Sequence, residues 1–195
     1  RKLRAMVSLR VTPECDAKTH PYSSTGLKNN KFGVAFDRAL DVYRKAAAMQ
    51  HIEVSGVDCH IGSQLTDDAP LREAMSRIVA LADTLNAEGI PIHHICPGGG
   101  IGIRYKDEVT IELDAYSQAL QASLGDRDVE LLLEPGRMLV GNAGLLLTRV
   151  EYVKPTQEKN FLVVDAAMND LIRPPLYQAY HAVWAVQVRD ETRRI

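Results

Sequence analysis

Three short stretches of the sequence end in residues that could bind a ligand or move protons. They are Val54–His60, which leads into Gly62-Ser63-Gln64; Ile92–Ile95, which leads into Gly98-Gly99-Gly100; and Val129–Leu133, which leads into Glu134-Pro135-Gly136-Arg137. Each stretch has the apolar, β-branched character of a strand. Because turns at the carboxyl ends of parallel strands gather on one edge of a sheet, we expect these three turns to form a single site.

The glycine run Gly98-Gly99-Gly100, which continues to Gly102, is suited to a phosphate group. Without side chains the backbone can approach an anion closely and present its N–H groups to it. A glycine-rich turn with no ligand is the alternative, and the run alone favours that alternative. The hydroxyl of Ser63 and the guanidinium of Arg137 on the neighbouring turns could complete a phosphate site.

Two further side chains on these turns could act on a bound ring. His60 ends its strand on the face opposite Cys59, so a thiol–imidazole pair is not expected, and its imidazole could lie flat on an aromatic ligand. A structural histidine bonded to backbone is the alternative. Glu134 follows apolar residues and precedes a proline, so we expect a carboxylate with restricted water access; its partner could be a protonated ring nitrogen, or Arg137 in a purely structural ion pair. No His/Cys spacing indicates a zinc site.

Farther along the chain, Arg173-Pro174-Pro175-Leu176-Tyr177 brackets a proline-fixed turn with a guanidinium and a phenol. This arrangement is suited to holding a carboxylate. A structural salt bridge made by Arg173 is the alternative.

The elements that must position these residues form a repeated strand–helix pattern. Strands are expected to begin near Met6, Val54, Ile92 and Val129, and the gaps between them carry apolar residues at helical spacing. The helical stripes are Phe36, Leu40, Tyr43, Ala47; Leu71, Met75, Ile78, Leu81, Leu85; and Leu113, Tyr116, Leu120, Leu124. Such repeats predict an α/β fold with a parallel sheet, either open and doubly wound or part of a closed barrel.

The pattern changes after Arg137. Leu145–Val153 and Phe161–Val164 are rich in β-forming residues, with a polar turn and no long helix between them. We therefore predict an α/β domain over residues 1–142 and the beginning of a β-rich domain over residues 143–195.

Composition limits the possible partners. The 195 residues are 46% hydrophobic and 25% charged, with a formal net charge of −2, so no large basic field is available for nucleic acid. No apolar run approaches the roughly 20 residues that a membrane span needs. Three widely spaced cysteines fit a reducing compartment, which makes cytoplasm the expected location. The first and last residues suggest a piece of a longer protein.

Several motifs together resemble a known family. They are Thr19-His20-Pro21, Ser24-Thr25-Gly26, Asn30-Lys31-Phe32-Gly33, HIGSQ at His60–Gln64, GGGIG at Gly98–Gly102, EPGR at Glu134–Arg137 and VDAAMNDLIRPPLY at Val164–Tyr177. The set resembles the bacterial diaminopimelate decarboxylases, which are alanine-racemase-like (fold III) pyridoxal-phosphate enzymes. The resemblance implies about half of a pyridoxal-phosphate-binding TIM barrel, followed by the start of a C-terminal domain resembling a β-sandwich or β-barrel.

The resemblance also implies roles for individual residues. His60 would stack on the pyridine ring of pyridoxal 5'-phosphate, and Glu134 would bond the ring nitrogen and keep it protonated. Arg137, Arg173 and Tyr177 would bind the substrate carboxylate distant from the reacting carbon. The phosphate would be held by Ser63, by Gly98, Gly99 and Gly100, and by the backbone of Pro135, Gly136 and Arg137.

Some features depart from the family pattern or lie outside this chain. Thr12 stands where asparagine is usual, and Cys96-Pro97 precedes the glycine run. No lysine here matches the family's Schiff-base motif, so we expect this chain alone to be inactive. The resemblance implies a homodimer with shared sites, acting on a small amino acid, meso-2,6-diaminopimelate, to give L-lysine.

Three other functions remain open at this point. The first is an ornithine, arginine or carboxynorspermidine decarboxylase of the same fold, the second a non-catalytic regulatory relative, and the third a phosphate-binding barrel without pyridoxal.

Overall fold

The computed structural model describes residues 3–16, 26 and 31–187. The chain divides into two compact units, the first made of residues 1–104 and 108–142 and the second of residues 105–107 and 143–195. Most of the motif around Thr19-His20-Pro21 and Ser24-Thr25, together with Asn30, lies outside the described residues.

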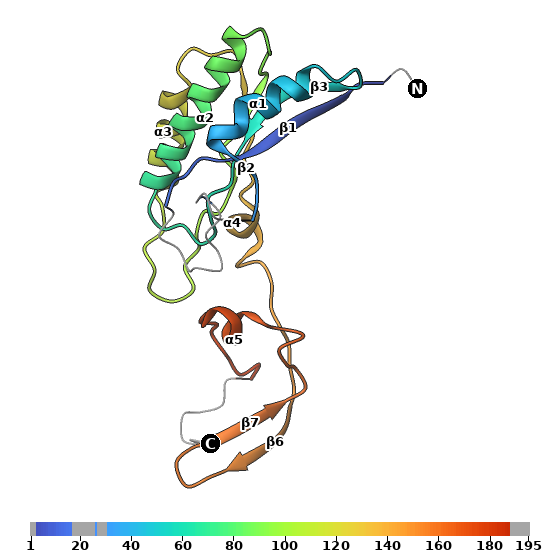
Figure 1. Ribbon diagram of the computed structural model, residues 1–195. Coiled ribbons are helices and arrows are strands. Elements are labelled where there is room, and N and C mark those ends of the chain that lie inside the picture. The colour runs from blue at the N-terminus through green and yellow to red at the C-terminus, as the bar shows by residue number, and fades with distance from the viewer. Residues whose placement is uncertain (1–2, 17–25, 27–30, 188–195) are drawn as a thin grey trace. The chain divides into compact units, whose positions relative to one another are not determined.

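The first unit is built on a five-stranded parallel sheet with the order β2-β1-β3-β4-β5. Figure 1 labels β1, β2 and β3 of this sheet. Its strands are β1 (Ala5–Thr12), β2 (Val34–Ala35), β3 (Ile52–Asp58), β4 (His94–Cys96) and β5 (Glu130–Leu131). The strands β1, β3, β4 and β5 add in sequence order, as in an arc of a barrel, while the two-residue β2 pairs with the other side of β1. The described elements confirm the predicted α/β class with a parallel sheet.

The strands differ from the sequence prediction in length. The last two were predicted over residues 92–95 and 129–133, but they pair only over His94–Cys96 and Glu130–Leu131. The ladder between β4 and β5 joins only His94 to Glu130 and Ile95 to Leu131, one residue short of the end of β4. The two-residue strand β2 was not predicted, because it is too short to show any periodicity.

Three helices follow these strands: α1 (Phe36–Ala47), α2 (Ala69–Ala87) and α3 (Leu113–Leu124). α2 packs against both α1 and α3, which lines the helices up along the sheet. The buried side chains are those of the predicted stripes, among them Tyr43, Met75, Ile78 and Leu120. Two positions were wrong: Ala47 is exposed, with its neighbour Ala46 buried instead, and Leu113 is 48% exposed.

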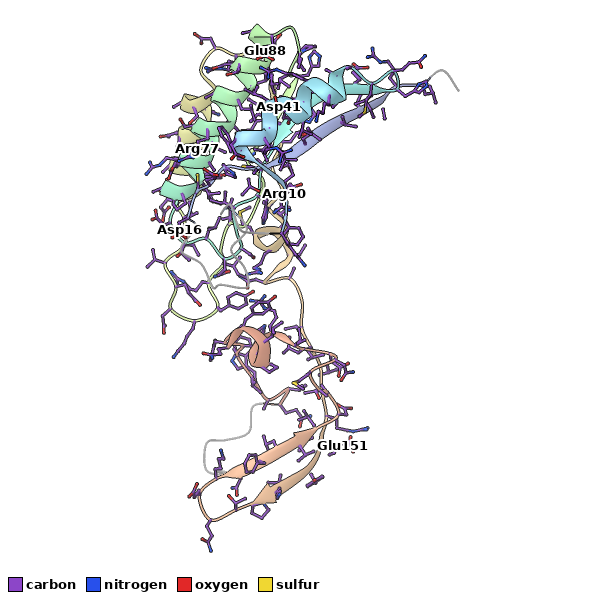
Figure 2. The ribbon with its side chains drawn as sticks, in the orientation of Figure 1. Arg10, Asp16, Asp41, Arg77, Glu88 and Glu151 are labelled. Atoms are coloured by element: carbon purple, nitrogen blue, oxygen red, sulfur yellow. The ribbon has the colours of Figure 1, made fainter. Side chains whose placement is uncertain are left out.

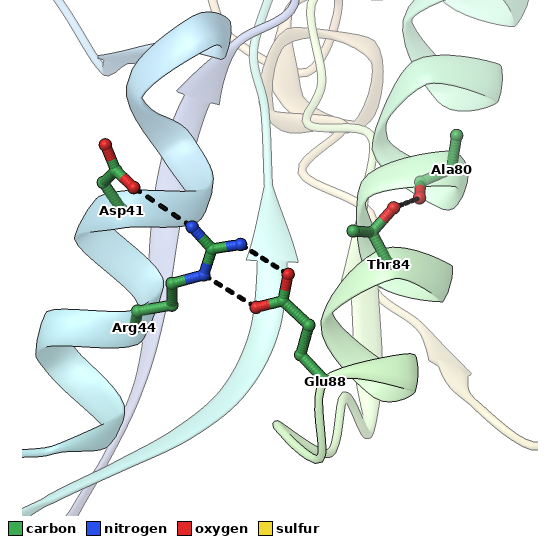
Figure 3. Close-up of polar contacts among 5 residues, drawn as sticks. All are labelled: Asp41, Arg44, Ala80, Thr84 and Glu88. Carbon is green, nitrogen blue, oxygen red and sulfur yellow. Dashed lines mark hydrogen bonds and ion pairs between the residues drawn. The ribbon is translucent and has the colours of Figure 1, made fainter.

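An ion pair joins the first two helices at their carboxyl ends. The guanidinium of Arg44 on α1 donates to both carboxylate oxygens of Glu88, the residue after α2, at 2.8 and 2.6 Å (Figure 3). Asp41 accepts a third bond from the same guanidinium at 3.2 Å. This bidentate geometry fixes the spacing of α1 and α2 at the surface.

The second unit contains an antiparallel hairpin of β6 (Val150–Pro155) and β7 (Asn160–Val164), followed by the short helix α5 (Arg173–Tyr177). Glu151 on β6, labelled in Figure 2, pairs with Arg149 at 2.9 Å. The first predicted strand of this unit started too early, because residues 145–149 precede the paired segment. Most side chains of the hairpin are exposed.

Among the described residues, no helix combines the length and the apolar character that a membrane crossing requires.

Candidate active site

The three predicted turns meet at one edge of the sheet, where main-chain hydrogen bonds join them. The N–H of Cys59 donates to the carbonyl of Cys96 at 2.9 Å, and the N–H of Leu65 donates to the carbonyl of Gly100 at 2.8 Å. The N–H of Glu134 donates to the carbonyl of Gly98 at 3.0 Å. The convergence predicted from the sequence is confirmed for the turns after β3, β4 and β5.

The glycine run is required by the close approach of these turns. Gly98 and Gly100 have φ of +81° and +90°, a region that favours glycine. A Cβ on Gly99 would overlap the carbonyl oxygen of Glu134, and one on Gly100 would overlap the carbonyl oxygen of Gly62. The Gly99 N–H already donates to Nδ1 of His60 at 3.3 Å, so a phosphate at this loop would use other donors.

His60 and Glu134 lie side by side on this edge. Nδ1 of His60 is 3.9 Å from Oε2 of Glu134, with the two side chains 25% and 59% exposed. Because Nδ1 accepts the bond from Gly99, the imidazole proton is placed on Nε2. Burial, together with the charge of Arg10, lowers the pKa of His60, although Glu134 opposes this shift. The imidazole is therefore held as a neutral, flat ring.

Glu134 is more open to solvent than the sequence suggested. We expected restricted water access because Leu131-Leu132-Leu133 precedes it, but Leu132 and Leu133 are themselves 38% and 46% exposed. The cause is that β5 is the edge strand of the sheet, so described elements cover it on one side only. The alternative ion pair with Arg137 is not favoured, since that guanidinium bonds Gln64.

Two residues of this edge, Asp58 and Cys96, were not predicted as site residues from the sequence. Oxygen atoms of Asp58 and Glu134 and the sulfur of Cys96 lie within 4.8 Å of one another. Burial is the main cause that raises the pKa of Asp58, and it also raises the pKa of Cys96 to about 12. The alternation of the predicted strand Val54–His60 could have revealed Asp58, because it lies two positions before His60, although β3 itself ends at Asp58.

Arg10, labelled in Figure 2, links the first strand to this edge. Its Nη2 donates to the carbonyl of His60 at 3.2 Å, and its Cζ lies 5.3 Å from the ring centroid of Phe32. This guanidinium places a positive charge beside Asp58 and His60.

Gln64 fixes the position of Arg137. Its Oε1 accepts bonds from Nη1 of Arg137 at 3.2 Å and from the N–H of Ile103 at 3.3 Å, while its Nε2 donates to the Ile103 carbonyl at 2.6 Å. Gln64 itself has a left-handed backbone, with φ of 61°. The sequence offered Gln64 only as part of a motif, and no spacing indicated that it would anchor Arg137.

The remaining predicted residues of the first unit lie on the same edge. Ser63 is half-buried next to Gln64. Pro135 precedes the short helix α4 (Gly136–Val140), and the Gly136 N–H donates to the carbonyl of Glu134 at 2.9 Å. Thr12, which stands where the family usually has asparagine, donates its hydroxyl to the carbonyl of Phe32 at 2.8 Å.

In the second unit, Arg173 and Tyr177 are the first and last residues of α5, with Pro174 and Pro175 between them. The segment predicted as a proline-fixed turn is thus a short helix, which brings positions i and i+4 together. Cζ of Arg173 lies 5.4 Å from the ring centroid of Tyr177. The guanidinium and the phenol are therefore held next to each other.

The sheet arc and its loop-edge site match a defined class of enzyme. The family profile described as "Pyridoxal-dependent decarboxylase, pyridoxal binding domain" matches residues 2–141. The chain belongs to this pyridoxal-dependent decarboxylase family, whose cofactor is pyridoxal phosphate.

Within this family, the relatives reported next are diaminopimelate decarboxylases. The chain is 60% identical over 186 residues to the diaminopimelate decarboxylase of Neisseria meningitidis serogroup A, covering 95% of this chain and 46% of the relative. It is 56% identical over 192 residues to the Pseudomonas aeruginosa enzyme of the same name, covering 98% and 46%. The solved structure of Helicobacter pylori diaminopimelate decarboxylase complexed with L-lysine matches with a TM-score of 0.90 and 43% identity, covering 96% of this chain and 47% of that one. The chain thus spans about half the length of the relatives it matches.

Proposed function

We propose that the complete protein containing this chain is a pyridoxal-phosphate-dependent diaminopimelate decarboxylase that converts meso-2,6-diaminopimelate into L-lysine. The bond from one α-carbon to its carboxylate breaks, carbon dioxide leaves, and a proton bonds to that α-carbon in its place. The observation that carries this proposal is the 3.9 Å pair of His60 and Glu134 on an edge where three turns converge. Relatives that are 53–60% identical and bear this enzyme's name support it.

The side chains of His60 and Glu134 on this edge fit the cofactor. A neutral imidazole offers a flat face to a pyridine ring, and a carboxylate beside it can accept the N–H of that ring. When bound, the cofactor supplies an electron sink for the charge left on the α-carbon.

Each residue then has a distinct task. His60 would orient the ring by stacking on it, and the bond from the Gly99 N–H holds the imidazole in place for that role. Glu134 would accept a hydrogen bond from the N–H of the ring nitrogen and so keep that nitrogen protonated. The turns Gly98-Gly99-Gly100 and Pro135-Gly136-Arg137 are proposed to surround the phosphate, with the hydroxyl of Ser63 and backbone N–H groups other than those of Gly99 and Gly136 as the donors.

Substrate choice is assigned to two guanidinium groups and a phenol. Arg137, Arg173 and Tyr177 are proposed to bind the carboxylate distant from the reacting carbon. Ornithine and arginine carry a cation at that end, so an arginine there would repel them, which favours diaminopimelate over the decarboxylases of basic amino acids. We further propose a homodimer located in the cytoplasm.

The test is carbon dioxide release by the complete gene product loaded with pyridoxal phosphate. We expect turnover of meso-2,6-diaminopimelate, little turnover of ornithine or arginine, and large losses in Glu134→Ala and Arg173→Ala. Wild-type rates in both variants would remove the proposed roles. Ornithine as the preferred substrate would support the alternative activity instead.

A further inference from the structure

The guanidinium of Arg173 lies near two tyrosine rings. Its Cζ is 5.3 Å from the ring centroid of Tyr105 and 5.4 Å from that of Tyr177. Both distances are within the roughly 6 Å over which a cation is attracted to an aromatic face. Such contacts restrict the plane of a side chain that is otherwise flexible.

The two rings have different origins. Tyr177 lies four residues after Arg173 on α5, so the helix itself supplies this contact. Tyr105 comes from the loop that follows the glycine run, a distant part of the sequence, yet residues 105–107 pack as part of the second unit. Nothing in the spacing of the sequence indicates this second contact.

Tyr105 is itself supported from another side. Its ring centroid is 5.5 Å from that of His181, with the two planes inclined at 55°. The next residue, Lys106, has its Nζ 5.7 Å from the ring centroid of Tyr180. The contact with His181 restrains the Tyr105 ring, and the contact of Lys106 with Tyr180 joins the same loop to the segment after α5.

One hydrogen-bond donor of the Arg173 guanidinium, which lies near the two tyrosine rings, has no acceptor among the described residues. Nε of Arg173 is buried and has no hydrogen-bond partner among the described residues. A buried, charged donor without an acceptor is unfavourable, and a carboxylate is the group that best matches a guanidinium. The arrangement is that of a cation prepared for an anionic ligand.

We propose that Tyr105 is a positioning residue for substrate recognition, holding the Arg173 guanidinium in the orientation that receives the distal carboxylate. This inference rests on the proposed function, which supplies that carboxylate. Tyr105 would act through its ring, because the contact with Cζ is a contact of the aromatic face. It would not touch the reacting carbon.

The experiment compares Tyr105→Leu with Tyr105→Phe in the complete, pyridoxal-phosphate-loaded protein. Leucine removes the ring, and we expect KM for meso-2,6-diaminopimelate to rise about 5- to 30-fold, the size of one partly desolvated cation–π contact, with kcat nearly unchanged. Phenylalanine keeps the ring and should restore KM to within about twofold of wild type. Tyr180→Leu changes the neighbouring ring without touching Arg173, and it should also stay within about twofold. If Tyr105→Leu does not fold, Tyr105→Met tests the same loss with a flexible side chain.

Inhibitors supply a readout that a general packing defect would not produce. L-Lysine retains the distal carboxylate and cadaverine lacks it, so Tyr105→Leu should weaken inhibition by L-lysine while leaving that by cadaverine unchanged. An unchanged KM, equal losses for both inhibitors, or a phenylalanine variant as impaired as the leucine variant would overturn the inference. If Arg173→Ala also leaves KM unchanged, the proposed anchor itself fails, which separates the two hypotheses.

Discussion

Replacing Gly99 by alanine should break the contact that places Glu134. An ideal Cβ at Gly99 overlaps the carbonyl oxygen of Glu134 and lies only 2.7 Å from its carbonyl carbon. Restoring ordinary contact at 3.4 Å moves that carbon by about 0.7 Å. Both colliding groups belong to the backbone, so no side-chain rotation can relieve the overlap.

The expected cost has two parts. Overpacking in a rigid region costs about 1–3 kcal/mol. The bond from the Glu134 N–H to the carbonyl of Gly98, now 3.0 Å, would be stretched beyond normal length, and such a bond contributes about 1 kcal/mol. We therefore expect a loss of about 2–4 kcal/mol in the free energy of unfolding.

The assay is urea denaturation of the complete gene product, with Gly136→Ala as the matched control. Gly136 lies two residues after Glu134, and a Cβ there has nothing within 4 Å. Both substitutions change the unfolded chain alike, so their difference isolates the collision. Equal midpoints for the two variants would refute the steric reasoning.

Three further predictions concern charge and burial. Asp58→Asn should raise the free energy of unfolding at pH 7.5 relative to an exposed control, Asp126→Asn. The gain should shrink as the pH falls towards 4, because burial raises the pKa of Asp58 and protonation of this carboxyl removes the buried charge that destabilises the native state. A gain independent of pH would contradict this reasoning. Glu88→Gln should lower the thermal midpoint slightly at low salt and not at high salt. Since Arg44 depresses the pKa of Glu88, the effect should also fade as the pH drops through that lowered value, and a loss that persists in 1 M salt would argue against it. Burial raises the thiol pKa of every cysteine, so none should react with a thiol reagent at pH 8 until the protein unfolds, as peptide mass mapping would show; rapid labelling of any one in the folded protein would disprove it. The cysteines are Cys15, Cys59 and Cys96.

Much of the first unit could be predicted because it follows strong periodic rules. The helical stripes around Tyr43, Met75 and Leu120 identified three helices, and apolar runs before polar turns identified the strands that position the site. Strand ends were less accurate, since pairing depends on the neighbouring strand: the ladder between β4 and β5 ends at Ile95 and Leu131, although the apolar run of β5 continues to Leu133.

The site was predicted only in part for a related reason. His60 and Glu134 stood out because each lies at the end of an apolar run. The contacts of Gln64 with Arg137 and of Tyr105 with Arg173 join segments that are far apart in sequence, and no local pattern records such contacts. Glu134 was expected to be shielded because its flanking leucines suggested burial, whereas its strand lies at the edge of the sheet.

The main-chain bonds between the three turns have a consequence for how this scaffold could be altered. Carbonyl and amide groups tie the turns together, so their geometry depends little on which side chains they carry, except where glycine is required. Positions such as Ser63 could then be randomised in a library without collapsing the loops. Redesign of the phosphate pocket would best begin there, leaving the glycines untouched.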